Sequence, residues 1–139
     1  MSNWLRAKIS TEIKNPRRDL LKKALNNMGY EPDYSKKAVH GSFSFEASEP
    51  VDCVLMHKDT GKESTIGLNI RRGKNGDVTL SVTGDFWGMS YDGNQFIKQL
   101  GLQYNCEHTK SVLEEQGYTI EETTQEENQI VMIGYRQVA

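Results

Sequence analysis

Apolar and polar residues alternate near the start of the chain. Ala7, Ile9, Thr11 and Ile13 are separated by single charged or polar residues. A period of two is typical of a strand that has one face in water, so we expect a strand over about residues 6–13.

The next apolar residues follow a helical period instead. Five of them would share one helical face: Leu20, Leu21, Ala24, Leu25 and Met28. Asn15 is a suitable capping residue and Pro16 is tolerated in a first turn, so we expect a helix over about residues 16–28. Gly29 is suited to end this helix, and the aromatic Tyr30 opens the next element.

A second helical pattern covers about residues 93–116, with apolar residues again at helical spacing. Asp92 and Gln95 have the spacing of a capping box, in which each side chain binds the backbone N–H of the other residue. The length of this segment and the glycine at Gly101 leave open a kink or a division into two helices.

The ends of the two helical patterns are alike. Gly117 and Tyr118 follow the second pattern as Gly29 and Tyr30 follow the first. A helix, a glycine and a strand therefore occur twice, which favours two related halves about a pseudo-twofold axis.

Between the two helical patterns the period returns to two. Four alternating segments predict strands over residues 39–45, 51–55, 66–70 and 78–82. Their short links, among them Asn75-Gly76, favour an antiparallel meander with a tight hairpin at that pair. Apolar residues at 118–120 and 130–134 predict a last hairpin, which turns at residues 126–128.

Together these elements predict an α+β fold. We expect a mainly antiparallel sheet of about six to seven strands, with two helical regions packed on one face. The chain of 139 residues has the usual size of one domain, and we see no linker, so residues 1–139 form a single domain in this interpretation.

Charge and composition exclude several classes of protein. A formal charge of −2 argues against bulk binding of nucleic acid. The apolar runs are too short for a membrane span or a signal peptide, so we expect a cytoplasmic protein without a membrane partner. Cys53 and Cys106 do not form a disulfide framework, and we expect both to be free thiols.

Catalytic and metal chemistry have little support in the sequence. Cys53 and His57 would lie about 13 Å apart along a strand, too far to share one zinc ion. No nucleophile motif such as G-x-S-x-G is present, and we expect no metal, no cofactor and no enzymatic activity. A small hydrolase that uses Asp85 or the region of His108 is the second alternative.

Basic residues are the candidates for ligand binding. Arg17 and Arg18 fall in the first turn of a helix, where the helix dipole disfavours cations, and a bound anion would compensate for them. Arg71-Arg72 and Lys74 sit beside the Asn75-Gly76 turn, where they could grip a phosphate. The alternative interpretation is two solvated basic patches.

One aromatic residue joins these candidates. Trp87, in the segment Gly84–Gly88, would offer its indole as a stacking surface beside a bound ligand. The alternative is that this segment is the end of a strand whose aromatic residues fill the core.

Acidic residues gather near the end of the chain. They are Glu114, Glu115, Glu121, Glu122, Glu126 and Glu127. Such segregated charge favours self-association or a basic protein partner, and a solvated face is the alternative.

Several motifs resemble one family. They are Ile9–Ile13, Leu20-Leu21-Lys22-Lys23-Ala24-Leu25, Gly29-Tyr30, Asp85-Phe86-Trp87-Gly88, Phe96-Ile97-Lys98-Gln99-Leu100, Gln103-Tyr104 and Val112–Tyr118. Their order is similar to that of the uncharacterised cyanobacterial and plastid family called hypothetical chloroplast frame thirty-five, a domain of unknown function also seen in bacteria and phages. The resemblance implies an α+β fold and carries no site residues, because the family has no agreed activity.

We therefore expect a non-catalytic binding protein and a homo-oligomer. The expected ligand is small and anionic, such as a signalling nucleotide, bound by the basic residues and Trp87. A phage origin would fit a protein that sequesters such a nucleotide. The first alternative is a protein–protein adaptor or assembly factor.

Overall fold

The computed structural model describes residues 2–8, 12–41, 48–86, 88–126 and 129–137. The helices are α1 (Arg18–Asn27) and α2 (Gly93–Glu115). The strands are β1 (Ser2–Lys8), β2 (Tyr30–Asp33), β3 (Ala38–Val39), β4 (Glu49–Pro50), β5 (Cys53–His57), β6 (Glu63–Arg72), β7 (Val78–Gly84), β8 (Thr119–Glu126) and β9 (Gln129–Gln137).

The described strands form three antiparallel sheets. A four-stranded sheet has the order β2-β5-β6-β7, a three-stranded sheet has the order β1-β9-β8, and β3 pairs with β4. The first strand therefore pairs with the last, with Ser2 opposite Gln137, so the two ends of the described chain lie together. The α+β class, the antiparallel pairing and the two helical regions are confirmed.

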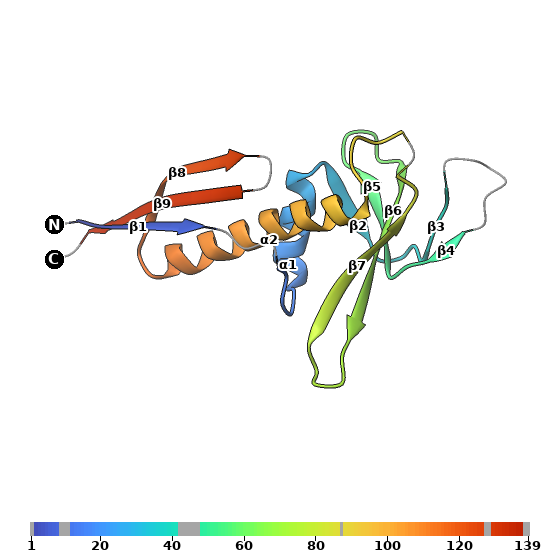
Figure 1. Cartoon of the computed structure of the whole chain (residues 1–139), viewed down its shortest axis with the longest axis horizontal. Helices are drawn as coiled ribbons and strands as arrows, with labels where there is room; N and C mark the ends of the chain where they lie inside the picture. Colours follow the sequence, from blue (N-terminus) through green and yellow to red (C-terminus); the bar gives the residue numbers. More distant parts are fainter. Residues whose placement is uncertain (1, 9–11, 42–47, 87, 127–128, 138–139) are drawn as a thin grey trace.

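Helix α2 connects the two larger sheets. It runs along the length of the molecule, with the three-stranded sheet at one end and the four-stranded sheet at the other (Figure 1). Leu100 packs into the cluster of the four-stranded sheet, and Leu102 packs with Ile130 and Met132 of the three-stranded sheet. Because two residues along a helix lie about 200° apart, the middle of α2 is apolar on two opposite sides.

The helix ends agree with the local sequence. Asp92 and Gln95 form the capping box at the start of α2. Gly29 and Gly117 have φ values of +91° and +87°, a left-handed conformation that ends a helix and that glycine adopts without strain. A strand follows each glycine, so the helix–glycine–strand unit does occur twice. Helix α2 continues through Gly101 without a break.

Buried side chains form one large cluster and two small ones. The large cluster lies between α1, α2 and one face of the four-stranded sheet, and includes Leu25, Leu68 and Phe96. A small cluster of Val39, Val51 and Val54 lies on the other face of this sheet. Both faces of the four-stranded sheet therefore carry buried residues, although Thr79 and Ser81 of β7 are exposed.

Two predictions from the sequence differ from the structure. The strands are divided among three sheets, so the expected count for one sheet is only approximate, because β3 pairs with β4 and not with the meander. The first strand is Ser2–Lys8, and Glu12 and Ile13 of the expected strand are not in a strand. The strand expected at 39–45 and the turn at 126–128 fall partly outside the described residues.

The predicted cap of the first helix was wrong. The N-cap is Arg17, two residues beyond Asn15. The Asn15 side chain instead accepts a hydrogen bond of 2.9 Å from the backbone N–H of Val78, beside the turn of the β6–β7 hairpin. A contact that is distant in sequence thus replaced the local one. In the described parts of the chain, neither helix has the length and hydropathy needed to cross a membrane.

Candidate functional site

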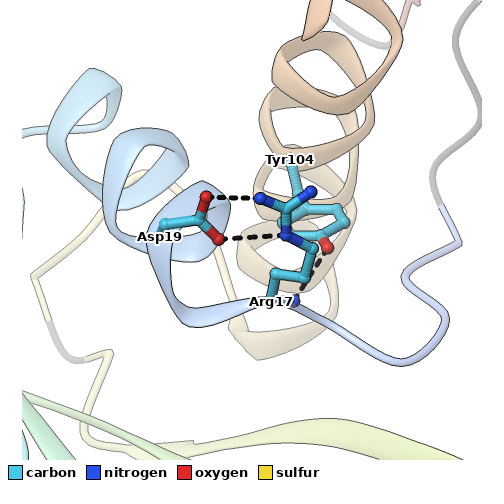
Figure 2. A network of polar contacts seen from close by, with 3 residues as sticks. All are labelled: Arg17, Asp19 and Tyr104. Atoms are coloured by element: carbon cyan, nitrogen blue, oxygen red, sulfur yellow. Dashed lines mark hydrogen bonds and ion pairs between the residues drawn. The ribbon is translucent and has the colours of Figure 1, made fainter. Parts of the chain in front are cut away.

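Arg17 is the N-cap of α1, one position before the helical turn in which it was expected, and its charge is already compensated. Its guanidinium group donates two hydrogen bonds to the carboxylate of Asp19, at 2.7 and 3.2 Å (Figure 2). This pairing lowers the pKa of the Asp19 carboxyl, with the hydrogen bond from Arg17 as the main cause. The backbone N–H of Arg17 donates to the Tyr104 hydroxyl of α2 at 2.9 Å. Arg17 therefore already has an anionic partner within the chain, Asp19.

Arg18 has a partner of a different kind. Its guanidinium carbon lies 4.1 Å from the centre of the Tyr34 ring, which is the geometry of a cation–π contact. Arg17 and Arg18 therefore contact different partners, Asp19 and Tyr34.

The second basic group is divided by the sheet. Arg71 and Arg72 are consecutive residues of β6, and consecutive strand residues point to opposite faces. Arg72 follows Ile66 and Leu68 on the helix side, whereas Arg71 is on the other side and Lys74 is exposed in the turn. Trp87 lies outside the described residues. Among the predicted binding residues that can be placed, Arg71 and Arg72 therefore point to opposite faces of the sheet.

A different part of the structure forms a cleft with a volume of about 400 Å³. This value is within the usual range of about 300–1,000 Å³ for small-molecule sites. The cleft lies between the end of α1, the first half of α2, and β8. Its lining residues are Asn27, Met28, Tyr30, Ser90, Tyr91, Gln95, Phe96, Gln99, Gln103 and Gln125. None of these ten residues carries a charge, and five are amides of asparagine or glutamine on three different elements.

One part of the cleft wall is aromatic. Tyr91 stacks on Phe96 with ring centres 6.0 Å apart, and Tyr30 meets Phe96 edge to face at 5.8 Å. The hydroxyls of Tyr30 and Tyr91 are hydrogen-bonded at 3.0 Å. Burial raises the pKa of Tyr30 well above its usual value, and this hydrogen bond raises it further. The phenol of Tyr30 is therefore neutral and able to donate at physiological pH.

Another part of the wall is a row of glutamines. Gln95, Gln99 and Gln103 are four residues apart and lie on one face of α2. The Gln103 amide donates to the Gln125 carbonyl of β8 at 3.2 Å, which joins the helix to the three-stranded sheet. An amide pair joined by one hydrogen bond still presents one donor group and one acceptor group. The Gln103–Gln125 pair can thus recognise a ligand edge that carries both a donor and an acceptor.

A second hollow continues from the cleft. It shares Met28 and Tyr30 with the cleft and adds His57, Lys58 and Asp59. The Tyr30 and His57 rings lie 5.6 Å apart. Lys58 is exposed, and no ion pair to it occurs among the described residues. The cationic Lys58 therefore lines the hollow that adjoins the neutral cleft, together with the acidic Asp59.

The residues considered for hydrolysis lie apart from this cleft. Asp85 lines a hollow of about 400 Å³ with His40 and Glu49, whereas His108 lies on α2 with its ring 6.3 Å from that of Tyr104. In the described ranges, no group of three or more His, Cys, Asp or Glu residues is placed to hold a metal ion. The two cysteines are free thiols, with Cys53 buried and Cys106 half-buried.

The sequence did contain a signal for the cleft. Glutamines at 95, 99 and 103 have helical spacing within a segment whose helical character was predicted. Their function could not be inferred from spacing alone, because the aromatic wall comes partly from β2 and the closing amide from β8. These partners are more than 20 residues away in the sequence.

Comparisons with known proteins place the chain in a family. No curated protein and no solved structure matches it. A family model matches residues 24–133, a range that includes all the lining residues of the cleft and more than half of the chain. The expected membership in an uncharacterised family is confirmed: the chain belongs to the family described as "Protein of unknown function (DUF1257)".

Proposed function

We propose that this protein is a non-catalytic binding protein whose cleft holds a small ligand with a flat, hydrogen-bonding ring, of the class of a nucleobase. The observation that carries the proposal is one cleft that glutamines and aromatic residues line together. Aromatic side chains offer surfaces and edges to a flat ring. Amides on the same cleft offer paired donors and acceptors, the groups that read the edge of a base.

Because the lining of the cleft is neutral, we place the base and the phosphate of a nucleotide in different hollows. A charged phosphate has no cationic partner among the ten residues of the cleft. The adjoining hollow contains Lys58 and His57, which can meet an anion. The proposed ligand is therefore a nucleoside or nucleotide with its base in the cleft and any phosphate toward Lys58. Arg17 and Arg18 are not needed for this arrangement.

Ligand titration tests the proposal. Nucleosides and nucleotides of each base are titrated into the purified protein by calorimetry, with thermal unfolding as a second readout, because a ligand of the folded state raises its stability. We expect at least one base to bind. Replacement of Gln103 by leucine should weaken binding about five- to tenfold, the usual value of one or two hydrogen bonds.

A matched substitution separates binding from folding. Gln137→Leu makes the same chemical change on an exposed residue of β9 outside the cleft, and should leave the affinity unchanged. Lys58→Ala should weaken nucleotide binding and spare nucleoside binding if the phosphate lies in the adjoining hollow. Absence of binding by every nucleoside and nucleotide, at unaltered fold, would refute the proposal.

A protein–protein adaptor is the second candidate function. The observation that favours it is Trp4, which is 66% exposed on β1. A large apolar side chain in water on an open sheet suggests a surface that another protein covers.

A further inference from the structure

The outer face of the three-stranded sheet has no packing partner in the described chain. Ile130 and Met132 of β9 point toward α2. Val131 and Ile133, between and beside them, point to the other side, where they line an open hollow of about 410 Å³. Tyr135 continues this row, and its ring lies 5.5 Å from that of the exposed Trp4. An apolar strip thus runs along the middle strand of an open face.

Charged residues of opposite sign lie on the two sides of this strip. Arg6 of β1 is opposite Ile133 of β9, and Ile133 is opposite Glu122 of β8. All three line the same hollow, so their side chains share the outer face. Glu126 lies farther along β8 and lines the hollow as well. One edge of the face therefore carries the basic Arg6, and the other carries the acidic Glu122 and Glu126.

Arg6 and Glu122 do not neutralise each other within one chain. Two strand spacings separate them, or about 10 Å between backbones. The ion pairs among the described residues are four, and neither Arg6 nor Glu122 takes part in any of them. Both charges are exposed and remain available to another molecule.

We propose that this face is the interface of a homodimer in which two copies pack sheet to sheet about a twofold axis parallel to β9. Rotation about that axis leaves each residue at the same position along the strand direction. It places β1 of one copy over β8 of the other. Arg6 of one copy then lies over Glu122 of the other, and the reverse pair forms at the same time. The Ile133 residues of the two copies meet near the axis, and the apolar strips cover each other.

Other orientations fit less well. A twofold axis perpendicular to the strands would place the basic edge of one copy over the basic edge of the other, and like charges oppose association. The parallel axis is the one that makes the pattern of charge self-complementary, as a twofold interface requires. A second copy is therefore the occupant that this face fits. The cleft of the proposed function lies on the helix side of β8, so dimerisation leaves it open.

Charge exchange tests the dimer by analytical ultracentrifugation of the full chain. We expect a dimer at micromolar concentration. Arg6→Glu and Glu122→Arg should each raise the dissociation constant more than about tenfold, because two symmetric ion pairs become repulsive. The double variant Arg6→Glu/Glu122→Arg should restore association to near the original value. Glu115→Arg, on the exposed end of α2, makes the same change of charge away from the face and should have no effect.

Zero-length cross-linking tests the axis without disturbing the charge. In an Arg6→Lys variant, a carbodiimide can join the amine at residue 6 to a carboxylate that touches it. Mixed light and heavy isotope-labelled chains should yield a cross-link from residue 6 to Glu122 between different chains. A monomer at all concentrations, a dimer unaffected by either single reversal, or a double variant no better than the single ones would overturn the proposal.

Discussion

The two larger sheets share one helix but differ in how they are covered. The four-stranded sheet has α1 and α2 on one face and the Val39–Val51–Val54 cluster on the other. The three-stranded sheet has α2 on one face and an open surface on the other. The first has buried residues on both faces, whereas the second has them on the face toward α2 and only partly buried apolar residues on the other.

The amount of buried apolar surface follows the same division. Among the described side chains, twelve buried residues form the cluster between the helices and the four-stranded sheet, against four between α2 and the three-stranded sheet. Because hydrophobic stabilisation increases with buried area, most of the stability should come from the larger cluster. The three-stranded sheet should open more readily, and its open face is free for a partner. Stability and interaction are thus assigned to different ends of α2.

The largest effect should come from Phe96→Ala. Phe96 is fully buried and contacts the rings of Tyr30, Phe86 and Tyr91. Loss of such a ring leaves a cavity and should lower the free energy of unfolding by about 3–5 kcal/mol. Urea denaturation followed by circular dichroism measures the change. An effect below that of a surface substitution such as Gln137→Ala would contradict the assignment of stability to this cluster.

A smaller and more local effect should follow from Ile130→Ala. Ile130 is 1% exposed, but its cluster has fewer buried members to support a cavity. The cost should fall near the lower end of the usual range of about 2–5 kcal/mol. Hydrogen exchange should become faster in β8 and β9 and stay unchanged in β5 and β6, because the two sheets open separately. Equal acceleration in both sheets would mean that they unfold as one unit.

The elements were predictable from the sequence to the extent that their signals are local. Asp92 and Gln95 specify the start of α2 through their own side chains, and Gly29 and Gly117 end helices by their own conformation. The assignment of strands to sheets was not predictable in the same way. The pairing of Ser2 with Gln137 joins chain segments at opposite ends of the sequence. The alternation of apolar and polar residues identifies a strand but does not show which strand it pairs with.

The candidate site shows the same limit. The charges of Arg17 and Arg18 were visible in the sequence, but their partners Asp19 and Tyr34 follow from side-chain geometry. Arg71 and Arg72 are adjacent in the sequence, which suggested a pair. Adjacent side chains of a strand, however, point to opposite faces of the sheet. The spacing of the glutamines was visible as well, and their meaning appeared only when Tyr30 and Gln125 were brought beside them.

The smallest of these effects should be that of Gly67→Ala, which tests whether the second face of the four-stranded sheet is packed. A Cβ atom at Gly67 would lie 2.5 Å from Cγ1 of Val51, so the neighbouring side chain would have to move. Overpacking of this kind should cost about 1–3 kcal/mol in the free energy of unfolding. Val51→Ala in the same chain removes the obstructing methyl groups, so the double variant should lose less stability than the sum of the two single variants. If the losses in the free energy of unfolding of the two single variants simply add up in the double variant, Val51 does not pack against Gly67. The contrast between the two sheets would then fail.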